Sequence, residues 1–254
     1  MSQKPKMGDS FLQYRSPAIE RLERRLFLRQ GLSLGALALL SGCALDDSES
    51  VQRLLSAMSR WNDSVQGLLF DPRRLAPEFP ESLITNPFPF NAFYTEDEVI
   101  DVDGGAYRLR LAGRIREKKP WSLPELYALP QQASQITRHI CVEGWSAIGK
   151  WSGMRFSDFL ERIGADLTAK YVGFKCDDNY STSIDMPTAL HPQTLLAFRF
   201  ADQILPPKYG FPMKLRIPTK LGFKNPKHIA EIFVTNDYPG GYWEDKGYNW
   251  FSGS

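Results

Sequence analysis

Cys141 is the residue whose type and neighbours point most directly to chemistry. It stands in the stretch RHICVEGWSAIGKWSG, where an apolar run ends and Glu143, Gly144 and Trp145 follow at once. A thiol in such a place can be a packed core residue, half of a disulfide or a ligand to a soft metal ion. The neighbouring residues alone leave these three alternatives open.

Familiar catalytic and metal-binding patterns do not decide between them. The sequence has no C-x-x-C and no H-E-x-x-H motif, and its three histidines, His139, His191 and His228, are scattered. A zinc site built from these histidines is therefore disfavoured. No glycine-rich loop follows a strand and opens a helix, so a dinucleotide site is disfavoured as well.

Composition and charge indicate an ordinary folded domain. The 254 residues are 43% hydrophobic and 24% charged, which is typical of globular proteins, and they can bury a sizeable core. Of 31 basic and 29 acidic residues, seven and three lie in residues 1–42, so the remainder carries a net charge of about −2. Because no basic stripe is left on the main body, we expect no nucleic-acid partner.

Residues 1–43 have the pattern of an export signal. Arg24-Arg25 precede a short apolar run, about Gly31 to Gly42, that is too short to span a bilayer. The paired arginines resemble a twin-arginine signal, and Leu40-Ser41-Gly42-Cys43 resembles a lipoprotein cleavage box. We expect a periplasmic protein, with Cys43 as a candidate lipid anchor; the alternative is a short anchor helix that happens to contain an arginine pair.

Three segments are expected along the chain: the signal in residues 1–43, a connecting region in 44–84 and the main domain in 85–254. Apolar residues in 46–70 recur at helical spacing, and five prolines between 72 and 89 predict an extended connector. Beyond residue 93, short alternating or apolar runs predict many strands and few helices. This pattern favours an α+β fold with mostly antiparallel sheet and short helices.

The elements that must position Cys141 can be placed by their patterns. A hairpin turn is expected at Asp202-Gln203, and Ser122 is expected to cap a helix. Helices are predicted at 122–129 and 155–165, and strands are predicted at 106–113, 135–144, 170–176, 180–184, 195–201, 213–218 and 228–236.

The block around Cys141 carries a family resemblance. RHICVEGWSAIGKWSGMRFSDFLERIG, the His-Pro-x-Thr-Leu segment at 191–195 and the Gly-Phe-Lys turn at 222–224 follow one another in order and spacing. Over residues 85–235 the sequence resembles the molybdopterin-binding domain of the sulfite oxidase family, and within it the exported bacterial branch that includes methionine sulfoxide reductases. The resemblance implies a sulfite oxidase-type fold, a Mo-molybdopterin cofactor and Cys141 as the thiolate ligand to molybdenum.

The same resemblance implies a set of cofactor contacts. Tyr209 and Lys214 stand where the related reductases have asparagine and arginine, and Cys176 stands where they have threonine. Lysine keeps the positive charge for a pterin phosphate but loses the bidentate fork of arginine. The implied cofactor-binding residues are Asn91, Tyr94, Thr95, Cys176, Tyr209, Lys214, Asn225, Pro226 and Lys227.

The resemblance therefore implies a molybdopterin-dependent oxidoreductase that acts on a sulfur group. We expect oxygen-atom transfer at a small or protein-bound sulfur substrate, as in methionine sulfoxide reduction. A monomeric catalytic subunit would exchange electrons with a separate membrane or soluble cytochrome. Two alternatives stay open: a dehydrogenase of sulfite or another oxyanion, and a binding lipoprotein that keeps the fold without the cofactor.

Overall fold

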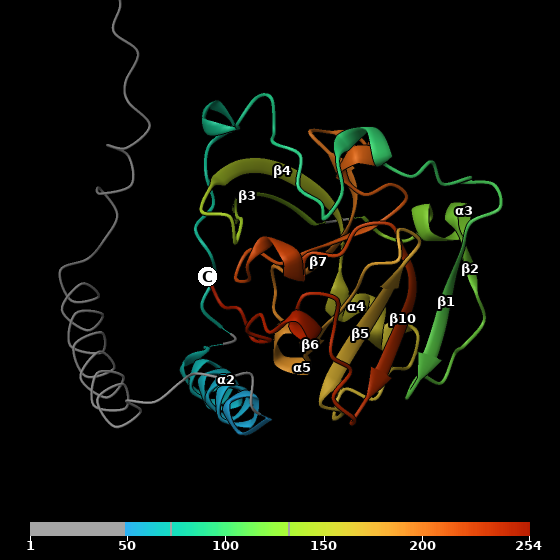
Figure 1. Cartoon of the computed structure of the whole chain (residues 1–254). Coiled ribbons are helices and arrows are strands. Elements are labelled where there is room, and N and C mark those ends of the chain that lie inside the picture. The colour runs from blue at the N-terminus through green and yellow to red at the C-terminus, as the bar shows by residue number, and fades with distance from the viewer. Residues whose placement is uncertain (1–48, 72, 132) are drawn as a thin grey trace, which may run out of the picture. The chain divides into compact units, whose positions relative to one another are not determined.

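The strands expected from alternation form two sheets in the computed structural model of this chain (Figure 1). The structure describes residues 49–71, 73–131 and 133–254, so the predicted export signal and Cys43 lie outside the described residues. Residues 56–254 belong to one unit. No helix within the described ranges is long and apolar enough to cross a membrane.

The first sheet has the strand order β2-β1-β10-β5-β6. β1 and β10 run parallel and the other neighbours run antiparallel. In β1, Leu109 and Leu111 are buried while the arginines between and before them are exposed, which confirms the predicted alternation. The bounds are β1 (Arg108–Gly113), β2 (Trp121–Ser122), β5 (Tyr171–Cys176), β6 (Ser181–Asp185) and β10 (Ile229–Thr235).

The second sheet has the order β3-β4-β7-β8, with β9 also paired to β7. The hairpin between β7 and β8 is present, but its left-handed turn residues are Ala201 and Asp202, one position before the predicted pair. The bounds are β3 (Ala133–Ile140), β4 (Ser146–Arg155), β7 (Leu195–Phe200), β8 (Gln203–Ile204) and β9 (Lys214–Arg216).

Short helices connect the strands, as predicted. Ser122 caps α3: its hydroxyl accepts the Glu125 N–H, and the Glu125 carboxylate accepts the Ser122 N–H in return. The α-helices are α2 (Glu49–Leu69), α3 (Leu123–Tyr127), α4 (Phe156–Arg162) and α5 (Met186–Ala189). The 3-10 helices are η2 (Glu81–Leu83), η3 (Glu96–Glu98), η4 (Pro207–Tyr209), η5 (Gly222–Lys224) and η6 (Glu244–Lys246).

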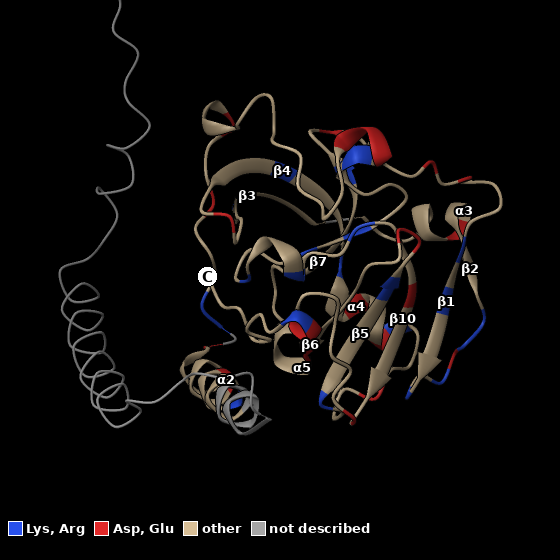
Figure 2. Ribbon diagram, viewed as in Figure 1, with Lys and Arg blue, Asp and Glu red and all other residues tan. Residues whose placement is uncertain are grey.

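The main apolar core joins the first sheet to α4 and to strands of the second sheet. Phe156, Phe159 and Leu160 of α4 are fully buried in it, and each such side chain contributes roughly 1.5–3 kcal/mol by leaving water. A smaller cluster gathers Phe88 and Trp151 with the apolar face of β7. Lys and Arg are interspersed with Asp and Glu along the described ribbons (Figure 2).

The proline-rich connector pairs with the second sheet, first with β3 and then with β4. The Phe79 N–H donates to the Ile136 carbonyl oxygen over 2.9 Å, and the Thr85 N–H donates to the Ile148 carbonyl oxygen over 2.9 Å. The connector thereby satisfies backbone groups that an open strand edge would leave unpaired. Its end brings Asn91 towards the turn that follows β3.

Candidate functional site

The turn between β3 and β4 presents the Cys141 thiol. The Cys141 N–H donates to the Trp145 carbonyl oxygen over 2.9 Å, and the Gly144 N–H donates to the Cys141 carbonyl oxygen over 3.2 Å. Gly144 has φ +91°, a left-handed conformation that glycine adopts without steric cost. The glycine noted in the sequence therefore sets the direction in which the thiol leaves the strand.

Two polar side chains contact this thiol. Asn91 Nδ2 donates to Cys141 Sγ over 3.3 Å, and Glu143 Oε2 lies 3.6 Å from the same sulfur. Burial, with a further contribution from the Glu143 carboxylate, raises the pKa of the Cys141 thiol. The thiol is thus protonated at neutral pH until a metal ion displaces its proton, and sulfur favours a soft metal.

A pocket that is open to solvent lies at the thiol. Its walls come from the segment after the connector, the β3–β4 turn, the β5–β6 turn, η5 with the residues after it, and Trp243. These segments are far apart in the sequence. The implied cofactor contacts that line the pocket are Asn91, Cys141, Asn225, Pro226 and Lys227.

Three other implied contacts lie outside the lining. The Tyr94 hydroxyl donates over 3.0 Å to Asp178, which does line the pocket. Thr95 is exposed and pairs with Glu98 to cap η3, so its hydroxyl is used locally. Cys176 is buried in the main core at the end of β5.

Tyr209 and Lys214 are buried but differ in what they contact. The Tyr209 hydroxyl donates to the Phe88 carbonyl oxygen over 2.7 Å, so this tyrosine packs in the aromatic cluster and does not line the pocket. Lys214 Nζ donates over 3.2 Å to the carbonyl oxygen of Asn225, a pocket residue. Lys214 therefore stands directly behind the pocket wall.

The cysteine alternatives can be compared with the structure directly. Cys141 and Cys176 are both buried free thiols, so the structure contains no disulfide between them. Burial raises the pKa of Cys176 well above its ordinary value, as expected for an inert core thiol. Cys141 differs because its sulfur faces the pocket and an amide donor.

Arg216 is a site residue that the sequence patterns did not single out. It is fully buried, and its guanidinium donates to Asn225 Oδ1 over 3.0 Å and to the Arg138 carbonyl oxygen over 2.6 Å. It therefore joins the strand that carries Cys141 to the turn at Asn225. The sequence did contain one indication of this role: Arg216 lies two residues after Lys214, and this spacing places both side chains on one face of a strand.

Positive charge is concentrated in and behind the pocket wall. Lys214, Arg216 and Lys227 are all buried, and none of them forms an ion pair with a carboxylate in the described part of the chain. Burial lowers the pKa of Lys227 to about 8 and that of Arg216 to about 9, and it lowers the pKa of Lys214 well below its ordinary value. Unpaired buried cations are costly, so this arrangement fits an anionic ligand.

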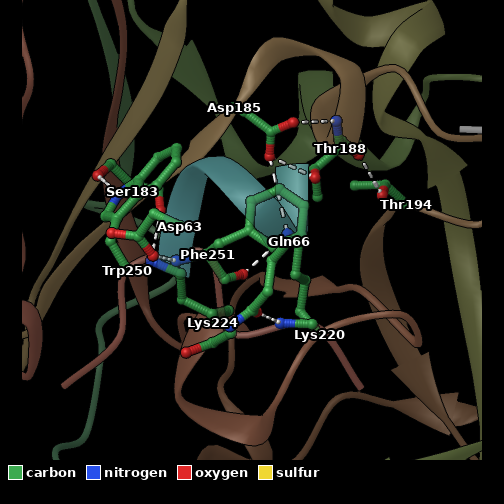
Figure 3. Close-up of polar contacts among 12 residues, drawn as sticks. Asp63, Gln66, Ser183, Asp185, Thr188, Thr194, Lys220, Lys224, Trp250 and Phe251 are labelled. Carbon is green, nitrogen blue, oxygen red and sulfur yellow. Dashed lines mark hydrogen bonds and ion pairs between the residues drawn. The ribbon is translucent and has the colours of Figure 1, made fainter. Parts of the chain in front are cut away.

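A compensated charge pair holds two other stretches of the pocket wall. Lys224 of η5 contacts the Glu244 carboxylate and donates to the Ser183 carbonyl oxygen over 2.7 Å. Glu244 directly follows Trp243, and Lys224 directly follows Phe223, so the pair ties together two stretches that line the pocket. Figure 3 shows Lys224 beside Ser183 and Trp250, with Asp63 of α2 bonded to Phe251.

The residues present fit a molybdopterin cofactor. The pocket and the side chains behind it offer one soft thiol, an amide donor on that thiol, and a set of buried cations that form no ion pair with any described carboxylate. His139, behind Gly222 of the pocket, has no hydrogen-bond partner on either ring nitrogen among the described residues. A metal-dithiolene group with an anionic tail would use the thiol at one end and the cations at the other.

Comparison with known proteins agrees with a molybdopterin-binding site. Residues 96–243 match the family described as oxidoreductase molybdopterin binding domain. The chain is 64% identical over 236 residues to an Azospira oryzae protein named as a proposed protein-methionine-sulfoxide reductase subunit, YedZ1, covering 93% of this chain and 90% of that one.

More distant relatives share the same kind of name. The chain is 28% identical over 244 residues to the protein-methionine-sulfoxide reductase catalytic subunit MsrP of Campylobacter jejuni, covering 87% of this chain and 76% of the relative. For MsrP of Burkholderia mallei the identity is 30%, over 54% of this chain and about half (46%) of the relative. The sulfane dehydrogenase SoxCD of Paracoccus pantotrophus shares the fold, with a TM-score of 0.51 at 16% identity over 55% of this chain and 40% of that one.

Proposed function

The chain belongs to the family of oxidoreductase molybdopterin binding domains, and from this premise we propose that it reduces methionine sulfoxide with electrons from a separate cytochrome. It is a molybdopterin-dependent oxidoreductase. The single observation that carries the proposal is the Cys141 thiol, held by Asn91 over 3.3 Å at the floor of the pocket. The names of its relatives support the sulfur substrate.

The chain's own residues would hold the cofactor at two ends. Molybdopterin supplies, when bound, two dithiolene sulfurs and a metal that exchanges electrons and an oxygen atom. Cys141 would provide the protein's thiolate to that metal, and Asn91 would fix the direction of its sulfur. Lys214 and Lys227 would stabilise the anionic end of the cofactor through charge-assisted hydrogen bonds.

The lining of the pocket favours a sulfoxide over sulfite. Phe93, Phe223 and Trp243 supply aromatic surface, which suits the methyl and methylene groups of a methionine side chain. Glu143 and Asp178 place two carboxylates in the same pocket, and these would repel a small dianion. A neutral sulfoxide on an apolar arm fits these walls better than an oxyanion does.

One experiment tests both the enzyme and its substrate. We would purify the full chain from a molybdate-fed host, measure molybdenum, and assay methionine sulfoxide reduction with a chemical reductant and sulfite oxidation with a dye acceptor. We expect stoichiometric molybdenum and activity on the sulfoxide. Protein that folds without molybdenum would support a binding lipoprotein instead, and activity on sulfite alone would overturn the substrate.

The two cysteines provide matched variants for this assay. Cys141→Ser should lower turnover by more than about 100-fold, because a hydroxyl is a hard and weakly acidic replacement for the thiolate ligand. Cys176→Ser should change turnover by only a few-fold, since that thiol lies in the core and not in the pocket lining. Equal losses in both variants would contradict the assignment of Cys141.

Export by the twin-arginine route belongs to the same proposal. It is supported by Arg24-Arg25 and the short apolar run before Cys43. Changing both arginines to lysine should leave folded, metal-loaded precursor in the cytoplasm, as seen by fractionation. Cys43→Ala should release the protein from membranes without changing turnover, and normal membrane association of this variant would contradict lipidation.

A further inference from the structure

Exposed apolar side chains are concentrated in one stretch of this protein. Of the ten large hydrophobic side chains that are exposed among the described residues, five lie between residues 58 and 75. The other five are spread along the chain from Leu83 to Tyr248. Scattered exposed hydrophobic residues are normal on a protein surface, whereas a contiguous group marks a binding surface. The five in this stretch are Met58, Trp61, Leu68, Leu69 and Leu75.

Four of these five lie on one side of α2. At 3.6 residues per turn, Met58, Trp61, Leu68 and Leu69 fall within an arc of about 100°, together with the half-buried Val65. An apolar side of this width normally faces the core of a protein. Here Trp61 is 60% exposed and Leu68 is 85% exposed, so the apolar side of α2 faces away from the core.

A different side of α2 attaches the helix to the domain, and its hydrogen bonds are polar contacts with the end of the chain. The Asp63 carboxylate accepts Asn249 Nδ2 over 2.7 Å and the Phe251 N–H over 2.8 Å. The Gln66 side-chain oxygen accepts the Gly253 N–H over 3.3 Å. Figure 3 shows Asp63 and Gln66 on the side of α2 that meets Phe251. These contacts hold the helix with its apolar side outward.

The chain before α2 indicates what the apolar side contacts. Cys43, the proposed lipid anchor, stands six residues before Glu49, and six extended residues span at most about 20 Å. A lipid on Cys43 would therefore hold α2 close to a bilayer. Within the described ranges no helix is long and apolar enough to cross that bilayer. A helix with one apolar side is suited to the membrane interface, where it lies parallel to the surface.

The charge of the stretch indicates how it would bind. Residues 49–75 contain four arginines and three acidic residues, so their net charge is only +1. This charge gives little attraction to anionic headgroups, and burial of apolar surface has to provide the binding. Trp61 suits this role, because tryptophan side chains favour the boundary between headgroups and acyl chains. The stretch is therefore suited to a bilayer of neutral lipid.

We propose that the apolar side of α2, formed by Met58, Trp61, Val65, Leu68 and Leu69, binds the surface of the lipid bilayer and holds the domain there in one orientation. This inference rests on the proposed function in one respect, the lipid on Cys43 that brings α2 to the membrane. Binding by α2 itself does not need that lipid, so the two can be tested separately.

The test uses the full chain carrying Cys43→Ala, so that no lipid on the protein contributes to binding. Its partition into phosphatidylcholine vesicles is measured by co-sedimentation. Leu68→Ser with Leu69→Ser removes part of the apolar side. The matched control is Leu83→Ser with Ile204→Ser, two aliphatic side chains that are 53% and 55% exposed elsewhere. All these proteins share residues 1–48, so differences in binding do not come from that segment.

We expect the Leu68/Leu69 double variant to bind about tenfold more weakly, since binding strength follows the apolar area that is buried. The control should stay within about twofold, and neither double variant should change the melting temperature. Binding of the parent should be the same at 0.1 and 0.5 M salt, to about twofold. Equal binding of the two double variants would overturn the inference, and so would binding that is lost at high salt.

A second measurement follows Trp61 in the wild-type protein on vesicles that contain brominated phosphatidylcholine. The bromine should quench a part of the fluorescence that is missing in Trp61→Phe. Equal quenching in both proteins would contradict insertion of this side. Membrane association in cells that needs Leu68 and Leu69, without any effect on vesicle binding, would assign the surface to a membrane protein and overturn the lipid assignment.

Failure of the proposed function would give different results. Protein without molybdenum would overturn the enzyme, and normal membrane association of Cys43→Ala in cells would contradict lipidation, but vesicle binding depends on neither. The Leu68/Leu69 double variant should keep its molybdenum and its turnover of a soluble sulfoxide, because neither residue lines the pocket. Loss of turnover in this variant would place α2 in the active site and contradict a role in membrane binding alone.

Discussion

Lys224 and Lys214 are two fully buried lysines ten residues apart, and their surroundings differ in sign. Lys224 meets the Glu244 carboxylate and lies 5.2 Å from the centre of the Trp250 ring. Burial lowers the pKa of its ammonium, but the Glu244 charge opposes that shift. The charge of Lys224 is thus compensated within the fold itself.

Lys214 has no carboxylate partner among the residues that the structure describes. Its ammonium reaches the Asn225 carbonyl oxygen and the face of Trp151, and its pKa is lowered first by burial and then by the charges of Lys227 and Arg216. Two lysines that the sequence alone does not distinguish therefore lie in opposite electrostatic surroundings. The ammonium of Lys224 is compensated by a carboxylate of the fold, and that of Lys214 forms no ion pair within the described residues.

The largest effect is expected when the Lys224–Glu244 pair is broken. Glu244→Leu should lower the free energy of unfolding by about 3–5 kcal/mol, because it leaves Lys224 buried without a counter-charge. Chemical denaturation would measure this. Glu81→Leu is the control: it removes an exposed partner of Lys150 and should cost at most about 1 kcal/mol. Similar losses of unfolding free energy in Glu244→Leu and Glu81→Leu would show that the buried pair of Lys224 matters no more than an exposed ion pair.

The second effect is a pH dependence of stability that comes from the buried cations Lys214, Arg216 and Lys227. Lys227 has a folded pKa of about 8, below the value of 10.5 expected in the unfolded chain. Between these values the unfolded chain binds the extra proton, so Lys227 should make the stability of cofactor-free protein rise with pH. Its own contribution is at most about 1.4 kcal/mol per pH unit, and it adds to that of the other buried cations with a lowered pKa.

Cofactor binding should flatten that rise, because an anion favours the charged lysine. Lys227→Met should make the rise less steep by the contribution of this one lysine, while Lys118→Met, at an exposed position, should leave it unchanged. Denaturation curves at pH 7.5, 8.5 and 9.5 would provide the comparison. A stability that falls across this range in the wild type but not in Lys227→Met would contradict the buried, unpaired state of Lys227.

The third effect is a gain in stability, whereas Glu244→Leu should cause a loss. Lys214→Met should raise the stability of the cofactor-free protein, because it removes a buried ammonium whose pKa is lowered first by burial and then by the charges of Lys227 and Arg216. The same change should lower cofactor retention by about tenfold. Thermal melts and molybdenum analysis would be run on the same preparation. Lower stability in this variant would show that Lys214 supports the fold as Lys224 does.

The smallest effect concerns the hydroxyl of Tyr209. Tyr209→Phe removes its hydrogen bond to the Phe88 carbonyl oxygen and should cost about 1 kcal/mol of stability. Its cofactor content should match the wild type, because Tyr209 does not line the pocket. A clear loss of molybdenum would restore Tyr209 to the set of cofactor contacts implied by resemblance.

Local patterns in the sequence were sufficient for most elements. The alternation in β1 and the cap at Ser122 depend on residues within a few positions of each other, and both appear as expected. β4, the longest strand described, was not among the predicted strands. Gly149 and Gly153 weaken its strand pattern, yet a Cβ at Gly153 would lie 1.9 Å from the Leu196 carbonyl oxygen. The need for glycine comes from a neighbouring strand.

The sequence by itself determined the thiol at Cys141, the glycine turn beside it, and the stretch from Asn225 to Lys227, because a motif records residues that act next to one another. Tertiary structure alone decided that Arg216 bridges to Asn225, that His139 lies unpartnered behind Gly222, and that Glu244 compensates Lys224 and leaves Lys214 unpaired. The physical reason is that burial and charge pairing depend on which distant segments meet, and no local spacing encodes that meeting.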